Sequence, residues 1–392
     1  MTWAERQRRL DGVLTEFRPW WQPQPFRDPR PAWVEAAPAL AADLLALDDD
    51  SAEDLNRDGD AALAYVGRHL PEAAAVAALA EVAPAPPAPL PDPGRFWDWA
   101  IPGRKRTQIT AFAAAARRSG RPLVDWCGGK GHLGRLLALH WQLPATCLEL
   151  DGNLCAEGEA LARRAGVDQR FVAADALRSA DFLRAGEHVV ALHACGNLHR
   201  HALVAGIEQG VAAFDIAPCC YHRGVEKTYR PLSTASSLLL SYDDLRLAVT
   251  ETVTASPRLT RERDRGMAWK LGFDAWRRRV AGDAYRPFKS VPAAWLRLSF
   301  GDCCRRLAER EGLPSPGPVD TAALEAMGWR RRGEVIRLSI VRHAFRRPLE
   351  IWLAGDLACH LESRGYEVAL RTFCARETTP RNLLLSARRV AG

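Results

Sequence analysis

Apolar and polar residues follow a regular order from about residue 95 to the end of the chain. Short apolar runs alternate with longer runs in which apolar residues recur at helical spacing. This order predicts parallel strands connected by helices that cover both faces of one sheet. The runs predicted as strands are 123–125, 147–151, 171–175, 188–192 and 212–217, with two more at 366–373 and 382–386 after a helix over 349–364.

Polar residues follow each of the first five apolar runs. They include Asp125, Glu149, Asp175, His193 and Cys219. In an open α/β sheet, ligands bind outside the carboxyl ends of the strands. The recurrence of reactive residues at this side of every predicted strand therefore indicates a functional site there.

The pattern before residue 95 is helical, and it ends in a proline-rich stretch. Residues 1–82 show Ala, Leu and charged residues at helical spacing, and the acidic run at 48–50 suits a helix start. Proline at the density of 83–94 is incompatible with a helix interior and indicates an extended linker. We predict an N-terminal helical domain over 1–82, a linker over 83–94 and a second domain over 95–392. The second domain has a helical insertion at about 224–345, before the last two strands.

A glycine-rich turn follows the first predicted strand and precedes a helix. Residues 129–134 satisfy the G-x-G-x-x-G pattern of dinucleotide sites, but Asp125 stands at the tip of the strand. A carboxylate there repels a pyrophosphate, whereas it suits the cationic ammonium of S-adenosylmethionine (SAM). We therefore favour SAM over a nicotinamide cofactor, and a tight turn without a ligand is the remaining alternative.

Acids after the second and third strands provide further cofactor contacts. Glu149 is predicted to accept hydrogen bonds from the ribose hydroxyls, with Asp151 as the alternative and a solvated loop acid as the structural explanation. Asp175 is predicted to contact the adenine amino group, or else to cap the helix that follows. The predicted cofactor-binding residues are Asp125, Cys127, Gly128, Gly129, Gly131, His132, Leu133, Glu149, Asp175 and His193.

The residues after the fourth and fifth strands are candidates for catalysis. Methyl transfer from SAM is a direct displacement, so the protein must align the nucleophile and remove its proton where necessary. His193 or His222 could be that base, and a cysteine could instead attack a pyrimidine ring. The cysteines could also be small core residues that shape the pocket. The predicted catalytic residues are His193, Cys195, Cys219, Cys220, Tyr221 and His222.

A metal site is a minor alternative at the same positions. Adjacent cysteines and an H-x-C spacing match structural zinc sites poorly, so the sequence analysis predicts no metal. Cys303 and Cys304 are predicted to be structural.

Charge and cysteine usage extend the prediction to partner and compartment. The formal net charge is +7 and the pI about 9.0, which favours an acidic partner such as RNA, although arginine-rich proteins are also common in high-GC genomes. Arginines and aromatic residues are interleaved between 224 and 345, which suits either a substrate-binding insertion or an ordinary helical one. The chain has ten cysteines, no C-x-x-C pair and no apolar N-terminal segment, so we expect a reducing cytoplasm and no membrane association. The sequence does not indicate the oligomeric state.

Four motifs in this order resemble a known methyltransferase family. They are residues 125–133 (D-W-C-G-G-K-G-H-L), 192–196 (L-H-A-C-G), 218–222 (P-C-C-Y-H) and 379–383 (T-P-R-N-L), and a basic element at 105–108 (K-R-T-Q) stands where the family has K-K-x-H-E. The family includes the methyltransferase-like twenty-five proteins and the glutathione-S-transferase-C-terminal-domain-containing proteins.

The resemblance covers about residues 100–390 and leaves 1–95 outside. It implies a class I, Rossmann-like α/β fold with a seven-stranded sheet, and SAM held by Asp125, Gly129, Gly131 and Glu149. A eukaryotic tRNA ribose methyltransferase has a similar motif pair, which implies RNA as substrate. The chain departs from these patterns at Gln108, where Glu is usual, and at Tyr221, where the tRNA enzyme has histidine.

The sequence therefore predicts a SAM-dependent methyltransferase that acts on RNA, either tRNA or rRNA. The alternatives are a protein or small-molecule methyltransferase and a SAM-binding or RNA-binding module without turnover. A nicotinamide oxidoreductase is the most distant alternative.

Overall fold

The chain forms two compact units, and each contains segments far apart in the sequence. The computed structural model describes residues 1–90, 92–94, 97–99, 101–178, 180–250, 257–282, 285–289 and 291–390. One unit comprises 1–15, 75–253 and 346–392, and the other comprises 16–74 and 254–345. These units cut the chain differently from the predicted domains, whose boundaries stay a prediction.

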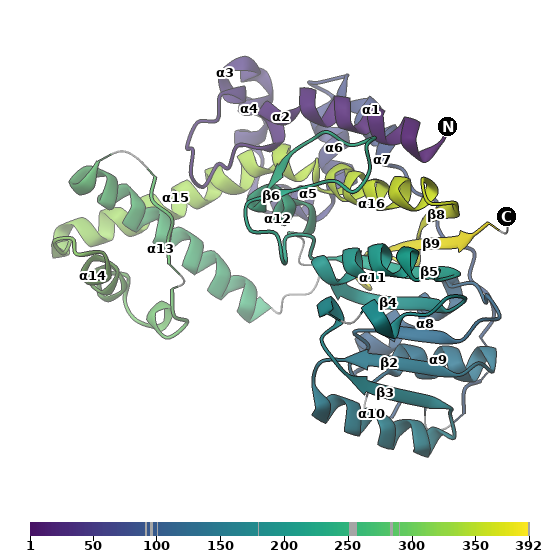
Figure 1. Cartoon of the computed structure of the whole chain (residues 1–392). Coiled ribbons are helices and arrows are strands. Elements are labelled where there is room, and N and C mark those ends of the chain that lie inside the picture. The colour runs from purple at the N-terminus through teal and green to yellow at the C-terminus, as the bar shows by residue number, and fades with distance from the viewer. Residues whose placement is uncertain are drawn as a thin grey trace. The chain divides into compact units, whose positions relative to one another are not determined.

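A seven-stranded sheet forms the centre of the first unit, with the strand order β3-β2-β1-β4-β5-β9-β8 (Figure 1). Neighbouring strands from β3 to β5 are parallel, and β9 runs antiparallel between β5 and β8. This is the class I, Rossmann-like methyltransferase arrangement, so the predicted α/β fold is confirmed. The strands are β1 (Leu123–Trp126), β2 (Ala145–Glu149), β3 (Gln169–Ala173), β4 (His188–Cys195), β5 (Ala213–Cys219), β8 (Tyr366–Thr372) and β9 (Leu383–Arg389).

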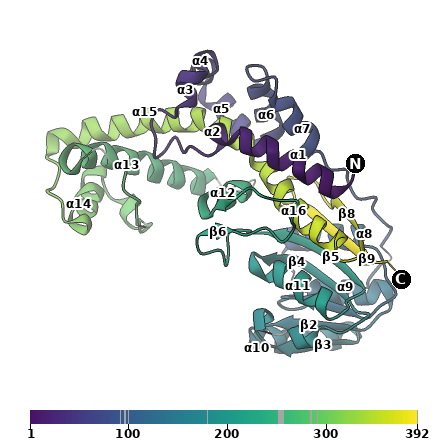
Figure 2. The same ribbon diagram turned by 45° about the horizontal axis from the view of Figure 1, so that its top comes forward.

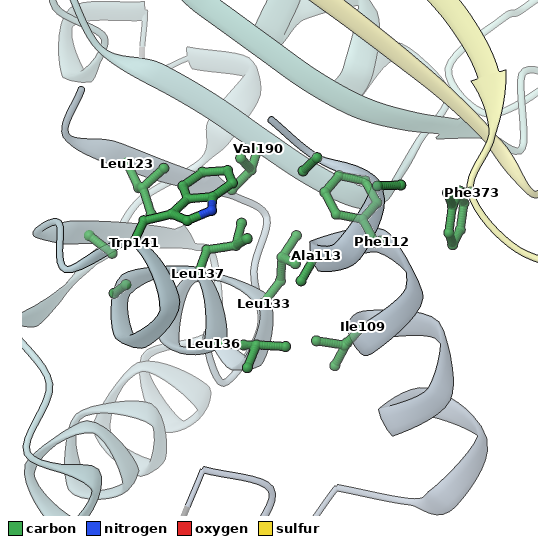
Figure 3. Close-up of a cluster of buried hydrophobic side chains, with 14 of the residues drawn as sticks. Ile109, Phe112, Ala113, Leu123, Leu133, Leu136, Leu137, Trp141, Val190 and Phe373 are labelled. Carbon is green, nitrogen blue, oxygen red and sulfur yellow. The ribbon is translucent and has the colours of Figure 1, made fainter. Parts of the chain in front are cut away.

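Helices cover both faces of this sheet. On one face, α8 (Gly103–Ala115) and α9 (His132–Trp141) enclose a buried apolar cluster with strand residues such as Val190 (Figure 3). The other face carries Phe214, which lies against Gly206 of α11 (Asn197–Glu208). Successive strand residues point to opposite faces, which explains why the apolar runs were continuous rather than alternating. The remaining helical elements near the sheet are α10 (Gly152–Ala165), η1 (Ala176–Arg178), η2 (Ala180–Phe182) and α16 (Arg346–Glu362).

The first helix, α1 (Trp3–Glu16), is joined to the sheet's unit by buried polar contacts. The Asp11 carboxylate accepts hydrogen bonds from the Ser237 amide, the Leu238 amide and the Trp352 indole at 2.9 Å each. These contacts explain why residues 1–15 group with the sheet. The unit also contains a short strand pair that the sequence did not predict, β6 (Thr228–Tyr229) with β7 (Leu240–Ser241), followed by α12 (Tyr242–Val249). The described residues of the proline-rich stretch contain no helix, and the Ala85 amide donates to the carbonyl of Thr372 at 2.8 Å.

The described residues of the second unit form helices and connecting loops, with no strands. Its long helices, α13 (Pro257–Ala281) and α15 (Pro318–His343), pack side by side (Figure 2). They approach closely because Gly328 lies against the Ala268 carbonyl, where a Cβ would come within 2.2 Å of the oxygen. The other helices are α2 (Arg18–Trp21), α3 (Trp33–Ala36), α4 (Pro38–Ala46), α5 (Asp49–Arg57), α6 (Gly59–Gly67), η3 (Trp295–Arg297) and α14 (Phe300–Glu311), and α7 (Ala73–Ala80) begins at the unit's edge. Asp48 caps α5, as its acidic run predicted.

Opposite charges bring the two segments of the second unit together. Residues 16–74 contain 5 Lys or Arg and 12 Asp or Glu, a net charge of −7, whereas residues 254–345 contain 19 and 10, a net charge of +9. Arg332 pairs with Glu53 at 3.3 Å and Arg337 with Asp49 at 2.7 Å. Arg277 and Arg278 are paired with acids inside the 254–345 segment itself. Much of the arginine excess is therefore used within the unit, which favours the ordinary helical insertion over a phosphate-binding one.

No helix in the described part of the chain is long and apolar enough to cross a lipid bilayer.

Candidate active site

The glycine loop connects β1 to α9 through tightly packed turns. A Cβ at Gly128 would come within 2.6 Å of the Asp125 carboxyl, and one at Gly131 within 2.4 Å of the Gln169 amide nitrogen. Gly129 differs, because no described atom lies within 4 Å of its Cβ position and its φ is +60°. The loop is thus closed against the protein at its base and open at Gly129, where a ligand can approach the backbone.

Asp125 lies beneath this loop and is only 1% exposed. Its Oδ2 accepts a hydrogen bond from the Gly134 amide in the first turn of α9 at 2.9 Å. Burial raises the pKa of the carboxyl to about 6, although the Gly134 amide, Lys105 and Arg135 act in the opposite direction. The sequence analysis expected a carboxylate open to a cationic ligand, whereas the structure places it under the turn that it helps to close.

Glu149, at the end of β2, holds the loop in place. Its Oε2 accepts from the Gly129 amide at 2.9 Å, and its Oε1 accepts from the amides of Leu150 and Asp151 at 2.9 and 3.1 Å. Asp151 caps α10 through the Asn153 amide. Asp175 accepts from the Leu177 amide at 3.0 Å, which is the capping role considered as its alternative.

Three other predicted cofactor residues differ in how far their side chains are enclosed. Leu133 lies in the apolar cluster between α8 and α9 (Figure 3). His132 is 3% exposed and its Nδ1 contacts Arg135; burial lowers the pKa of its imidazole to about 3. Cys127 is partly exposed in a left-handed conformation with φ of 57°, and burial raises the pKa of its thiol to about 12.

His193 lies at a bulge near the end of β4, where it contacts the 105–108 element. Its φ is +65°, and the pairing of β4 with β5 shifts register between Leu192 and Cys195. Its Nε2 lies 3.2 Å from Oε1 of Gln108 in α8, and Gln108 donates to the Thr378 carbonyl at 3.1 Å. Burial lowers the pKa of His193 to about 4. Gln108 therefore connects His193 to Thr378, the residue directly before the 379–383 motif.

Three cysteine thiols from β4 and β5 form a cluster beside His193. The sulfur atoms of Cys195, Cys219 and Cys220 lie within 4.8 Å of one another, and those of Cys195 and Cys219 are 3.5 Å apart. Hydrogen bonds from the other two thiols lower the pKa of Cys220, whereas the hydrogen bond with Cys195 raises that of Cys219. Of the three thiols, Cys220 is therefore the one whose pKa is lowered.

Tyr221 points into the core instead of toward a ligand. It is 1% exposed, its ring lies edge-on to His199 at 5.3 Å, and burial raises the pKa of its phenol. Its hydroxyl has no hydrogen-bond partner within the described part of the chain. A phenol in this position lies away from the pocket at His222, and its catalytic role stays a prediction.

A pocket of about 440 Å³ opens next to the cysteine cluster. His222 and Tyr242 meet edge-to-face in it at 5.4 Å, and burial lowers the pKa of His222. Arg381 donates to the Val249 carbonyl at the same pocket. The lining residues are Cys220, His222, Tyr242, Arg246, Val249, Thr250 and Arg381.

Sequence analysis missed Tyr242 and Arg246, because they lie in the region assigned to the insertion. A signal was present at Ser241, three residues before Asp244, since this spacing forms the capping box that starts α12. The box fixes the helix whose first turns face the pocket.

Comparison with protein families finds one match. Residues 104–226 match the family model described as a methyltransferase domain, a range that includes β1 to β5, the glycine loop and the cysteine cluster. The fold and this match define the class: the chain carries a SAM-dependent methyltransferase domain, and SAM is its cofactor. The loop that is open at Gly129 and anchored by Glu149 fits such a cofactor.

Solved structures of methyltransferases are similar at low identity. A TehB-like SAM-dependent methyltransferase from Corynebacterium glutamicum is 17% identical over 28% of this chain and 60% of its own, with a TM-score of 0.23. An rRNA methylase from Streptococcus thermophilus is 12% identical over 36% of this chain and 93% of its own (TM-score 0.24). An O-methyltransferase family protein from Burkholderia thailandensis is 11% identical over 74% of this chain and 57% of its own (TM-score 0.31). Comparison with curated proteins finds no match.

Proposed function

We propose that the domain transfers a methyl group from SAM to RNA. The observation that carries this proposal is the pocket beside the cysteine cluster, because its lining suits a nucleotide. Tyr242 is 42% exposed and offers an aromatic face for a base, and the pocket is bordered by Arg246 and Arg381. Base stacking on aromatic side chains and arginine contacts to phosphate are the common means of holding single-stranded RNA.

The protein's part in the reaction is positioning and proton removal. When bound, SAM supplies an electrophilic methyl group on its sulfonium. The backbone at Gly129, held by Glu149, and the end of β4 would position this cofactor at the carboxyl edge of the sheet. His222 lines the pocket, so it is the group that would accept a proton from an RNA nucleophile there. His193 is the alternative base, and it lies in β4, the strand between β5 and the cofactor-loop strand β1.

The Glu149→Gln variant is expected to bind S-adenosylhomocysteine about tenfold more weakly. Glutamine keeps the size of the side chain, but its NH₂ group cannot accept a hydrogen bond. Either the Gly129 amide, or the Leu150 and Asp151 amides together, therefore lose their acceptor. Isothermal titration calorimetry measures the effect. Asp151→Asn is the matched control, because Asp151 only caps α10, and its affinity should stay within twofold of wild type. A larger loss in Asp151→Asn than in Glu149→Gln would assign the cofactor contact to Asp151.

The Arg246→Ala variant is expected to bind RNA about fivefold more weakly, with a shallower salt dependence. Loss of one phosphate contact lowers the slope of log affinity against log salt by about 0.7 to 0.9. Filter binding of tRNA between low and moderate salt measures both quantities. Arg170→Ala removes an exposed arginine from the edge strand β3 and is the control for net charge. Equal effects of the two variants would show that the pocket does not hold the RNA backbone.

Methyl labelling tests the substrate class directly. An extract from a strain lacking this protein is incubated with the purified chain and tritiated SAM, then separated into RNA, protein and small molecules. Label in RNA supports the proposal, and label confined to protein or small molecules would replace it with the corresponding alternative.

A further inference from the structure

The thiols of Cys195, Cys219 and Cys220 converge from two different strands. The sulfur atoms of Cys195 and Cys219 are 3.5 Å apart, and all three lie within 4.8 Å of one another. None of the three is in a disulfide. Cys219 is 3% exposed, whereas Cys195 and Cys220 are partly exposed, so the cluster is enclosed on one side and accessible on the other.

The backbone is bent out of its ordinary conformation at this point. Neighbouring residues in an extended strand point to opposite faces, so adjacent cysteines do not normally share a site. Here Cys220 has a φ of +46°, which turns its side chain back toward Cys219, and His193 has a φ of +65° two residues before Cys195. In the described part of the chain only four residues other than glycine have positive φ; one of them, Cys220, belongs to this cluster, and another, His193, lies two residues before its member Cys195. Left-handed residues without a glycine's freedom are strained, and such strain concentrates at functional sites.

The spacing of the sulfur atoms is close to that of a tetrahedral thiolate site. Zinc–sulfur bonds of about 2.3 Å place neighbouring thiolates roughly 3.8 Å apart, a distance inside the observed range. Soft thiolates select zinc or monovalent copper over harder cations. Three protein ligands and one open position is the arrangement of catalytic zinc sites. The open side here is the pocket at Cys220, where Nδ1 of His222 is buried without a hydrogen-bond partner among the described residues.

We propose that Cys195, Cys219 and Cys220 bind one Zn²⁺ ion at the carboxyl ends of β4 and β5. The sequence analysis predicted no metal because adjacent cysteines match zinc spacings poorly. Adjacent cysteines fail to share a metal only where the backbone is extended, and Cys220 is in a left-handed conformation instead. The metal site does not depend on the nature of the methyl acceptor.

The chain contains a matched control in its other adjacent pair. Cys303 and Cys304 lie in α14 and are packed in the apolar core of the second unit. In the described part of the chain, no third metal-binding side chain lies close enough to join them. They test whether any adjacent pair of cysteines in this protein takes up zinc.

Metal titration of the full-length chain tests the proposal. Purified, reduced protein is stripped with a chelator and titrated with Zn²⁺ in competition with a chromophoric chelator, and Co²⁺ is added separately for its thiolate absorption bands. Wild type should bind one equivalent, Cys219→Ala and Cys220→Ser should bind at least 100-fold more weakly, and the Cys303→Ala/Cys304→Ala variant should match wild type. Circular dichroism and S-adenosylhomocysteine binding identify variants that remain folded, and the partly exposed Cys220 is the safer position if Cys219→Ala is unstable.

Two outcomes would overturn the proposal. One is less than one equivalent of Zn²⁺ bound by wild type, and the other is unchanged affinity in a folded Cys220→Ser variant. Zinc binding is measured without methyl transfer. A chain that binds zinc but methylates no RNA would therefore retain the metal site and lose the proposed substrate.

Discussion

Replacement of Gly196 by alanine is expected to lower the stability of the methyltransferase domain by about 3 kcal/mol or more, and to abolish methyl transfer. Gly196 follows β4 with φ +57° and ψ −126°, a conformation that only glycine adopts readily. An added Cβ would also lie 2.0 Å from the carbonyl oxygen of Arg223, and both backbones would have to move. The Gly196 amide donates to the Cys219 carbonyl at 3.0 Å, so the movement would separate Cys195 from Cys219.

Thermal unfolding and S-adenosylhomocysteine titration measure this result, with Gly166→Ala as the control. Gly166 ends α10 with φ +67°, and its Cβ position has no described atom within 4 Å, so alanine there should cost only about 1 kcal/mol. A Gly196→Ala protein with wild-type stability and cofactor affinity would contradict the described turn.

Replacement of Asp125 by asparagine is expected to stabilise the free protein at pH 8 while weakening cofactor binding. Burial raises the pKa of this carboxyl from 3.8 to about 6, so ionisation at neutral pH costs the folded state about 3 kcal/mol. Asparagine can still accept from the Gly134 amide, but its buried NH₂ group brings two N–H donors, so we expect a net gain on the order of 2 kcal/mol.

The stability difference between Asp125→Asn and wild type is expected to depend on pH. A raised pKa means that the folded state binds more protons than the unfolded state between about pH 4 and pH 6. Asp125 therefore contributes its stability at low pH, and the contribution is lost as pH rises through about 6. The advantage of the variant should be absent at pH 4 and full at pH 8, measured by urea unfolding at each pH.

Cofactor affinity separates two roles for the same carboxyl. If its charge attracts the ammonium of the ligand, Asp125→Asn should bind S-adenosylhomocysteine about tenfold more weakly at pH 8. Lys105, Arg135 and Glu149 contribute to the field at Asp125 and are unchanged in the variant. An unchanged affinity would leave Asp125 with the structural role of closing the loop, and would withdraw the electrostatic reason for choosing SAM over a nicotinamide cofactor.

The strands and the edge at which the site lies could be predicted from the sequence, because both follow from local patterns. Apolar runs ending at or next to Asp125, Glu149 and His193 indicate strands. Because ligands bind at the carboxyl ends of strands in such sheets, the same runs also indicate where the site lies. The orientation of side chains at those ends could not be predicted. Asp125 lies under the loop, where it accepts from the Gly134 amide, and Tyr221 points into the core, where it packs against His199. Both orientations depend on how the chain folds back on itself, which a strand pattern does not encode.

Two other features of the structure could not be predicted from the sequence, for different reasons. The left-handed conformations of His193 and Cys220 contradict the preference of their residue types, so no propensity indicates them. The association of residues 16–74 with 254–345 depends on complementary net charges and on packing across a long separation in sequence. The interleaved arginines and aromatic residues therefore suited a nucleic-acid surface and an ordinary helical insertion equally, whereas in the structure several of the arginines have carboxylate partners in their own unit.

This pairing of distant segments has a consequence for biosynthesis. The acidic segment leaves the ribosome roughly 180 residues before its basic partner, and the strands β1 to β5 are made in the interval. Until translation reaches residue 345, the acidic helices lack their counter-charges, and β9 cannot enter the sheet until the last residues emerge. Nascent chains arrested before residue 254 should therefore expose residues 16–74 to protease, and should become protected there only after the second segment has been synthesised.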